Sequence, residues 1–213
     1  MSTVANFTFN PFQENTYILY DETKECIVID PGCYTDSERK ELTNFIEAND
    51  LKPIRLINTH CHIDHVMGNK FIAEKYDLEL EIHSGEIPVL DSLLDVSKKY
   101  GIPVEPSPDA SIFIEAGDLV KFGNTTLKTL FTPGHSPASI SFYCEADQYV
   151  IAGDVLFYGS IGRTDLPGGN HATLLKSIRE QLFVLDGGVR VYPGHGPATS
   201  IGFERDNNPF LNS

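Results

Sequence analysis

Short apolar runs broken by charged turns dominate the first half of the chain. Runs rich in β-branched and aromatic residues predict strands at 16–20, 26–29, 54–58 and 78–82. Between these runs, apolar residues recur at helical spacing, which predicts helices at 37–49, 64–76 and 87–100.

The second half of the chain repeats this theme. Strands are predicted at 111–114, 119–122, 126–131, 139–144, 149–152 and 189–192, with a helix at 172–185. A proline-rich stretch at 103–108 separates the halves, but strands resume directly after it with no change of composition. We interpret it as a surface loop within one domain that covers 1–213. Two sheets packed together with helices outside would bury these elements, which predicts an α/β fold.

Length and charge narrow the class of protein. A chain of 213 residues, 41% of them hydrophobic, is long enough for one sizeable core. Its net charge of −14 argues against nucleic acid as a partner, because phosphate binding needs clustered Lys and Arg. No apolar run approaches the ~20 residues of a membrane span, so no membrane partner is expected. We expect a small-molecule substrate, and the sequence leaves the oligomeric state open.

The compartment is indicated by what the N-terminus lacks and by the cysteines. The first residues lack the basic flank and apolar stretch of a secretory signal. The four cysteines are scattered singly along the chain, which is typical of reduced thiols rather than of a disulfide framework. Both observations favour the cytoplasm.

The densest group of candidate ligands lies at 59–65, which reads Thr-His-Cys-His-Ile-Asp-His and follows a predicted strand. His60 and His62 are two positions apart, so their side chains project to the same side of an extended or tightly turned backbone. Asp64 and His65 follow at once and can face a second ion. Neutral imidazole and carboxylate suit Zn²⁺, with Fe or Mn as alternatives. The run therefore predicts a metal site, and its spacing indicates two divalent ions.

Three further candidate ligands lie downstream, and each follows a strand and a glycine. They are His135, Asp154 and His195. Glycine lets the backbone approach a crowded site and adopt conformations closed to other residues. Taken singly, each could be a polar turn residue, but together with the first group they indicate ligands at strand ends.

Other polar residues near these motifs receive structural interpretations. Asp30 ends a strand and is predicted to cap a turn. Cys61 would face away from metals that its neighbours bind, so we expect a packed side chain rather than a catalyst. No ligand role is predicted for His83 or His171, which lack the glycine and strand-end context.

In order and context, these seven residues resemble the metallo-β-lactamase superfamily, and within it the glyoxalase II-like hydrolases (hydroxyacylglutathione hydrolases). The resemblance covers nearly the whole chain and implies a four-layer αββα sandwich with the metals at one edge between the sheets. It implies a first metal held by His60, His62 and His135, and a second held by Asp64, His65 and His195. Asp154 would link the two metals, and Asp64 would also orient the nucleophile, which makes it the catalytic candidate.

The segment 159–169 resembles the Gly-Arg-Thr-Asp segment of short bacterial glyoxalase II-like proteins, and the ending 204–210 is similar to theirs. Arg163 is a candidate clamp for a substrate carboxylate, because its planar fork matches that group; an ordinary salt bridge within the loop is the alternative. The C-terminal helical domain of full-length glyoxalase II, which supplies much of the glutathione site, has no counterpart in this sequence. The resemblance therefore leaves the thiol carrier open.

The expected function is metal-dependent hydrolysis of a thioester such as S-lactoylglutathione. Two divalent ions, with Zn²⁺ as the first expectation, would activate a water, so that no Ser or Cys nucleophile is needed. The alternatives are a persulfide dioxygenase, which uses one iron and resembles the chain at the same ligand positions, and a lactonase. A non-catalytic metal sensor is the alternative from another class. An Asp at position 154, where common dinuclear β-lactamases carry Cys, argues against antibiotic hydrolysis.

Overall fold

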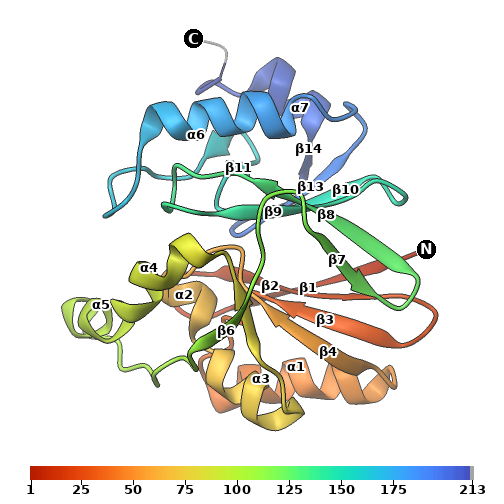
Figure 1. Ribbon diagram of the computed structural model, residues 1–213, viewed down its shortest axis with the longest axis vertical. Helices are drawn as coiled ribbons and strands as arrows, with labels where there is room; N and C mark the ends of the chain where they lie inside the picture. Colours follow the sequence, from red (N-terminus) through yellow and green to blue (C-terminus); the bar gives the residue numbers. More distant parts are fainter. Residues whose placement is uncertain (212–213) are drawn as a thin grey trace. The chain divides into compact units, whose positions relative to one another are not determined.

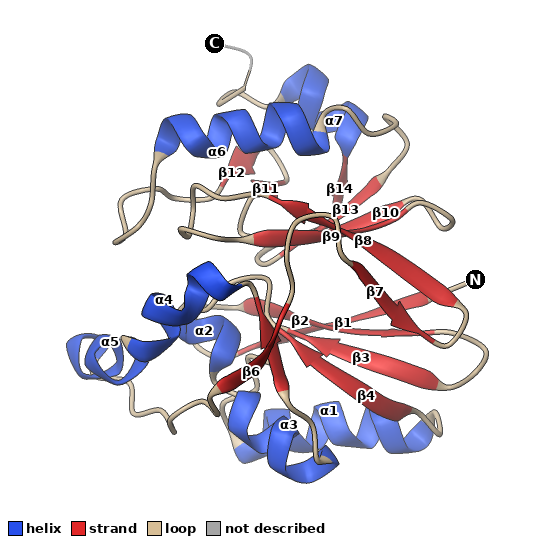
Figure 2. Cartoon of the chain, in the orientation of Figure 1, coloured by secondary structure: helices blue, strands red, loops and turns tan. Residues whose placement is uncertain are grey.

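The computed structural model describes residues 1–211, and the chain divides into two compact units (Figures 1 and 2). The first unit contains Met1–Ile114 together with Lys121–Thr125. The second contains Glu115–Val120 and the chain from Thr126 onward. Each unit has its own sheet and its own apolar core.

The sheet of the first unit has the strand order β1-β2-β3-β4-β5-β6. Its strands are β1 (Thr3–Phe9), β2 (Glu14–Tyr20), β3 (Glu25–Ile29), β4 (Lys52–Ile57), β5 (Leu80–Ile82) and β6 (Ala110–Phe113). The first three strands pair antiparallel, whereas β3 to β6 pair parallel. Parallel neighbours need crossover segments. These contain α1 (Asp36–Ala48), α2 (Ile63–Val66), α3 (Asn69–Tyr76), α4 (Ile87–Asp91) and α5 (Leu93–Tyr100).

Helices α1 and α3 cover one face of this sheet (Figure 1). Leu42 and Ile46 of α1 and Ile72 of α3 are buried in one cluster with Val28 and Leu56 of the strands. A face of alternate strand residues thus meets the apolar stripe of each helix, which is the pattern that the sequence periodicity predicted.

The carboxyl ends of the parallel strands position the first part of the candidate site. Strand β3 is followed by Asp30, and β4 is followed by Asn58 and the histidine run. The backbone N–H of Asp30 donates to the carbonyl of Ile57 at 2.9 Å, which continues the pairing past the strand ends. Because neighbouring parallel strands end at the same edge, residues 30 and 58–65 lie together there.

Two helices predicted as continuous are divided in the structure. The helix expected over 64–76 is split into α2 and α3 before Gly68, whose N–H donates to the carbonyl of Pro31 at 2.7 Å. A Cβ at Gly68 would lie 2.6 Å from that oxygen, so only glycine permits this approach. The helix expected over 87–100 is split at Ser92, whose hydroxyl donates to the carbonyl of Val89 at 2.7 Å and competes with the helical pattern.

The other sheet, which belongs to the second unit except for residues 121, 122 and 125, has the strand order β14-β13-β10-β9-β8-β7. Its strands are β7 (Leu119–Phe122), β8 (Thr125–Phe131), β9 (Ile140–Cys144), β10 (Tyr149–Gly153), β13 (Arg190–Pro193) and β14 (Thr199–Ser200). A small hairpin of β11 (Leu156–Phe157) and β12 (Ser160–Ile161) follows β10. The helices are α6 (His171–Ser177), continued by a π-helical stretch Ile178–Leu182, and α7 (Ile201–Asn207).

The helices α6 and α7 lie over one face of this second sheet (Figure 2). Leu174, Ile178 and Leu182 are fully buried in a cluster with Val150 and Val191 of the strands. The helix expected over 172–185 ends earlier than predicted, at Leu182. The sequence patterns had not indicated β1, β11, β12, β14 or α7.

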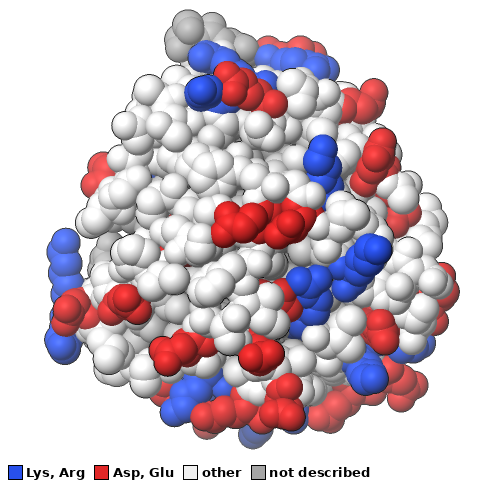
Figure 3. Space-filling view, viewed as in Figure 1, with Lys and Arg blue, Asp and Glu red and all other residues white. Residues whose placement is uncertain are grey.

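Acidic side chains outnumber basic ones on the face drawn in Figure 3, in keeping with the net charge of −14. Lys and Arg are scattered between the acidic groups there rather than gathered in a continuous field. Among residues 1–211, no helix combines the length and the apolar character that crossing a lipid bilayer requires.

Candidate metal centre

The histidine run of the first unit is compact and mostly buried, with His62 half-buried. His60 and His65 are fully buried, and their ring centroids lie 4.1 Å apart. The ring of His62 meets that of His60 at 4.8 Å. Asp64 places its Oδ2 3.7 Å from Nε2 of His65. The spacing read from the sequence therefore does bring these four side chains together.

Hydrogen bonds at the Nδ1 atoms orient two of these imidazoles. Nδ1 of His65 lies 3.1 Å from Oδ2 of Asp30, a carboxylate that only accepts, so Nδ1 carries the proton. Nδ1 of His60 lies 3.1 Å from the hydroxyl of Thr59, which itself donates to Asp30 at 2.6 Å and can accept from the ring. In both rings Nε2 is then left with the lone pair that a metal requires.

Asp30 has a larger role than the turn cap predicted for it. Besides His65, its carboxylate accepts from the N–H of Thr59 at 2.7 Å and from the amide of Asn58 at 3.4 Å. Asp30 is 1% exposed and has a φ of 50°, a left-handed conformation that Asp tolerates better than most residues. Asp30 is therefore a positioning residue for the histidine run. The sequence reasoning missed this role.

The short helix α2, which carries Asp64 and His65, is held by side-chain amides. Asn10 donates to the carbonyl of Asp64 at 2.9 Å, and Asn58 donates to the carbonyl of His65 at 2.9 Å. The amide of Asn69 in turn donates to Asn58 at 2.7 Å. A helix of four residues has little stability of its own, so these contacts fix where its ligands point.

A buried carboxyl group lies beside this part of the site. Glu14 is fully buried, and its Oε1 lies 4.0 Å from Nδ1 of His65. Burial raises the pKa of Glu14 well above its usual value, although His65 and a hydrogen bond from Thr16 act in the opposite direction. The carboxyl group thus keeps its proton at pH values where an exposed glutamate is ionised.

In the second unit, Asp154 lies between two histidines. Its Oδ2 is 3.4 Å from Nε2 of His135 and 3.5 Å from Nε2 of His195. Asp154 and His135 are buried, whereas the side chain of His195 is 27% exposed. The three strand-end residues singled out in the sequence therefore converge, with one carboxylate oxygen facing both imidazoles.

Glycines and a backbone carbonyl set the orientation of His135. Its Nδ1 lies 2.8 Å from the carbonyl oxygen of Arg163, which only accepts, so Nε2 again keeps its lone pair. Gly134, with a φ of 130°, packs so closely on α6 that a Cβ would lie 2.3 Å from the nitrogen of Leu174. A Cβ at Gly162 would lie 1.9 Å from the carbonyl oxygen of Asp154. Both glycines are therefore required by close backbone approach.

The side chain of Arg163 forms the loop salt bridge that was the alternative to a substrate clamp. Its guanidinium donates to both carboxylate oxygens of Asp165 at 2.7 Å, and both side chains are more than half exposed. The hydrogen bonds from Arg163 lower the pKa of Asp165 to about 2. The fork of Arg163 thus holds a carboxylate in this structure, and that carboxylate belongs to the chain itself.

The remaining polar residues of the motifs have structural surroundings. Cys61 is 1% exposed, and burial raises the pKa of its thiol well above the usual value, so the thiol is neutral at physiological pH. Nδ1 of His83 accepts from the N–H of Gly85 at 3.0 Å and caps a 3₁₀ turn. His171 is the exposed first residue of α6.

The donor set suits divalent metals of the Zn and Fe type. Buried imidazoles that present Nε2, together with carboxylates, are the ligands that these ions prefer. Candidate donors of this kind lie within each unit: His60, His62, Asp64 and His65 in the first, and His135, Asp154 and His195 in the second.

The sequence profile of the metallo-β-lactamase superfamily matches residues 9–195, which is most of the chain and spans every one of these ligand candidates. The chain belongs to this superfamily. The family predicted from the sequence is thereby confirmed.

Two relatives of this metallo-β-lactamase superfamily chain align over almost its full length. The probable metallo-hydrolase YqgX of Bacillus subtilis is 42% identical over 95% of this chain and 94% of its own. The hydroxyacylglutathione hydrolase GloC of Haemophilus influenzae is 35% identical over the same shares of the two chains.

Two solved structures have the same fold as this chain. The B3 metallo-β-lactamase BLEG-1 superposes with a TM-score of 0.90 at 35% identity, over 99% of this chain and all of the other. TTHA1623, solved in a di-iron-bound form, superposes with a TM-score of 0.88 at 34% identity, over 98% of this chain and all of the other. The α/β fold of metallo-β-lactamase type predicted from the sequence is confirmed by this likeness.

Proposed function

We propose that the chain is a dinuclear metal-dependent hydrolase that cleaves thioesters such as S-lactoylglutathione. The observation that carries the proposal is the position of Asp154, whose Oδ2 lies 3.4 and 3.5 Å from Nε2 of two histidines. One carboxylate oxygen facing two metal ligands suits a group shared by two ions. The relative named hydroxyacylglutathione hydrolase supports the class of substrate.

The proposed ligands come from both units, which would therefore work as one functional domain over 1–213. The first ion would be bound by His60, His62 and His135, the second by Asp64, His65 and His195, and Asp154 would be shared. This assignment leaves each imidazole with Nε2 for the metal wherever its Nδ1 has an acceptor nearby.

Bound divalent ions lower the pKa of water from 15.7 toward about 7 and polarise a carbonyl oxygen. The side chains of the protein would orient the attacking water and the substrate. Asp64 would accept a hydrogen bond from the attacking water and so direct it at the thioester carbonyl carbon, which makes it the catalytic residue. The neutral buried thiol of Cys61 takes no part as a nucleophile.

Arg163 would bind a carboxylate of the substrate in place of Asp165. The bidentate pair with Asp165 is the geometry that such a clamp would reproduce, and more than half of the Arg163 side chain is exposed. Arg163→Ala should raise KM for a carboxylate-bearing thioester several-fold with a smaller effect on kcat, because the contact acts on ground and transition states alike. Steady-state kinetics measure this, and an unchanged KM would leave Arg163 with the loop salt bridge alone.

Zn²⁺ is the ion that we propose first, since imidazole and carboxylate ligands suit it. Iron is the alternative, because the similar structure TTHA1623 was solved in a di-iron-bound form. Metal analysis of protein purified without added metal distinguishes the two.

The experiment that tests the function combines metal analysis with a substrate panel of S-lactoylglutathione, a lactone, a persulfide and a β-lactam. Two metal ions per chain and release of free thiol from S-lactoylglutathione are the expected results. One iron per chain with oxygen consumed in the presence of the persulfide would instead identify a dioxygenase. Preferred turnover of the lactone or the β-lactam would replace the substrate class. No thioester cleavage with both metal positions filled would overturn the proposal.

A further inference from the structure

Helix α7 carries a buried acid, and the residue that follows the helix is a buried amide; the proposed chemistry uses neither. Glu204 and Asn208 are both fully buried. They belong to the C-terminal segment whose likeness to short glyoxalase II-like proteins was visible in the sequence. A buried carboxylate is costly unless hydrogen bonds compensate it, so its partners indicate what the group does.

The carboxylate of Glu204 accepts from donors in three different chain segments. The N–H of Gly159 donates to both of its oxygens at 3.1 and 3.0 Å. The hydroxyl of Thr199 donates to Oε1 at 2.5 Å, and the amide of Asn208 donates to Oε2 at 2.7 Å. These segments are the turn between β11 and β12, strand β14, and the residue that follows α7.

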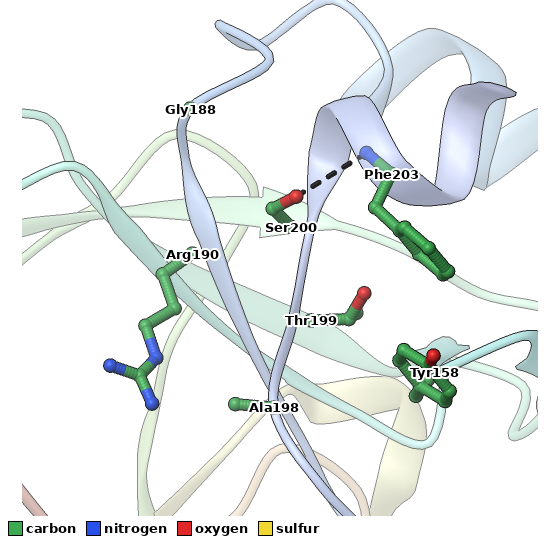
Figure 4. Close-up of a pocket in the computed structure, with 7 residues that line it drawn as sticks. All are labelled: Tyr158, Gly188, Arg190, Ala198, Thr199, Ser200 and Phe203. Carbon is green, nitrogen blue, oxygen red and sulfur yellow. Dashed lines mark hydrogen bonds between the residues drawn. The ribbon is translucent and has the colours of Figure 1, made fainter. Parts of the chain in front are cut away.

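Asn208 also binds the turn between β11 and β12. Its amide also donates to the carbonyl of Ser160 at 3.0 Å, so consecutive backbone groups of the turn are bound by the pair. The ring of Tyr158 stacks on that of Phe203 with centroids 5.0 Å apart and an angle of 8°. Figure 4 shows both rings lining an open surface groove. Thr199 lies there between the strand that carries Arg190 and the helix that carries Phe203.

The turn held in this way lies between two parts of the candidate metal centre. Asp154 precedes the β11–β12 hairpin, and Arg163 follows it directly. The carbonyl of Arg163 accepts from Nδ1 of His135 at 2.8 Å, so the position of the hairpin also fixes that imidazole. Thr199, on the other side of the carboxylate, lies four residues after His195 in the sequence.

We propose that Glu204, together with Asn208, is a positioning residue that fixes the turn at residues 158–160 and thereby the places of Arg163 and His135. The proposal rests on the proposed function, in which Arg163 binds a substrate carboxylate and His135 binds a metal. Glu204 touches neither the substrate nor a metal, and it acts through the backbone that it binds.

The substitution Glu204→Gln tests this with side-chain size unchanged. Three donors converge on the carboxylate, whereas a glutamine would turn its own NH₂ group toward one of them and leave it without an acceptor. The matched control is Glu180→Gln, which removes the same charge from a side chain that is 59% exposed. Asn208→Ala is a milder second variant, because it leaves Gly159 and Thr199 bound to Glu204.

The first readout is amide hydrogen exchange of the full chain, followed by mass spectrometry. Glu204→Gln should speed exchange in peptides that cover 155–166, Asn208→Ala should do so to a smaller extent, and Glu180→Gln should not. The second readout is metal retention against a chelator. The dissociation constant should rise roughly tenfold in Glu204→Gln, as for a displaced partner of a ligand imidazole. Neither readout depends on turnover.

The third readout separates positioning from general loosening of the fold. In Glu204→Gln, KM for S-lactoylglutathione, which bears carboxylates, should rise about fivefold or more, whereas KM for the neutral lactoyl thioester of N-acetylcysteamine should change little. Equal changes for both substrates, or unchanged exchange at 155–166 in both test variants, would overturn the inference. A wild-type chain that cleaves no thioester would overturn the proposed function alone, since exchange and metal retention would still decide the role of Glu204.

Discussion

Single hydrogen bonds at imidazole Nδ1 atoms decide which nitrogen two of the candidate ligands, His65 and His135, present to a metal. Asp30 serves His65 in this way, and the backbone carbonyl of Arg163 serves His135. Both acceptors are fixed by their own contacts, since Asp30 also accepts from Thr59. These contacts thus leave Nε2 of both candidate ligands with its lone pair.

Asp30→Asn should weaken metal binding by roughly 10- to 100-fold, because an amide is a poorer acceptor for His65 than a carboxylate. Asp50→Asn is the control, since Asp50 is exposed and has a φ of 53°, close to the 50° of Asp30. Competition with a chromophoric chelator measures the affinity. Equal affinities in the two variants would remove Asp30 from its positioning role.

Asp154→Ala should lower the metal content toward one ion per chain. A carboxylate between two cations offsets their mutual repulsion, and its loss leaves only the better-held ion bound. Elemental analysis after gel filtration measures the stoichiometry, with the exposed Asp109→Ala as the control. Two ions retained in Asp154→Ala would mean that the carboxylate is not shared.

The candidate ligands could be singled out from the sequence, because the strand-end context and the glycines are local signals, and their binding of metal stays a prediction. The positioning role of Asp30 could not be predicted from the sequence. Its partner His65 lies 35 residues away, and only the parallel pairing of β3 with β4 brings the two strand ends together. The hydrogen bond from His135 to the carbonyl of Arg163 was equally invisible, since a backbone acceptor leaves no trace in residue identity.

Among the elements, α1 shows how a local sequence signal sets a helix boundary. Thr35 and Glu38 form a reciprocal capping box, in which the Thr35 hydroxyl accepts from the N–H of Glu38 and the Glu38 carboxylate accepts from the N–H of Thr35. Glu38 also accepts from the N–H of Asn10 at 2.7 Å, so the same carboxylate ties α1 to the loop after β1.

Thr35→Ala should therefore lower the free energy of unfolding by about 1 kcal/mol, the usual cost of a lost N-cap. Ser37→Ala, an exposed change two positions along, is the matched control. Urea denaturation of both variants in the presence of a chelator measures the difference without a contribution from bound metal. A Thr35→Ala variant as stable as Ser37→Ala would contradict the capping role.

The elements that the sequence did predict, such as β3, β10 and α1, have buried residues that form a clear apolar run or a helical repeat in the sequence. Strand β1 was missed because its residues are mostly exposed or half-buried, so no apolar run marks it. Strand β14 has two residues and is defined only by its pairing with β13. The breaks at Gly68 and Ser92 depend on contacts that helical spacing does not encode, above all the approach of Gly68 to Pro31.

At the scale of the whole molecule, the chain leaves the first unit after Ile114 and returns to it for Lys121–Thr125. Asp21 holds the returning segment. Its carboxylate accepts from the N–H of Asn124 at 2.7 Å and from the hydroxyl of Thr125 at 2.9 Å, in addition to two bonds from Thr23. Burial raises the pKa of Asp21, but these hydrogen bonds outweigh it and the pKa is lowered.

Asp21→Ala should destabilise the fold by roughly 1–3 kcal/mol near neutral pH, because buried donors lose their acceptor. A lowered pKa in the folded state means that the contribution is present above the unfolded-state value of about 4 and is lost as the pH falls through the folded value. The gap between wild type and variant should therefore shrink below about pH 4. Urea denaturation of wild type and variant, near neutral pH and again below about pH 4, measures this difference in the free energy of unfolding.

The exposed Asp91→Ala serves as the control for Asp21→Ala and should show a small effect. A gap between wild type and Asp21→Ala that widens on acidification would contradict the direction of the pKa shift.

The return of Lys121–Thr125 also constrains how the protein can be made and divided. Asp21 and its partners Asn124 and Thr125 are separated by 103 and 104 positions, so on the ribosome the first unit has to wait for the start of the second before this contact can close. For the same reason, no single cut in the gene yields both units whole. A split version of this protein would have to carry the chain through residue 125 on the N-terminal fragment and repeat residues 115–125 on the other, because strands β7 and β8 include part of 121–125.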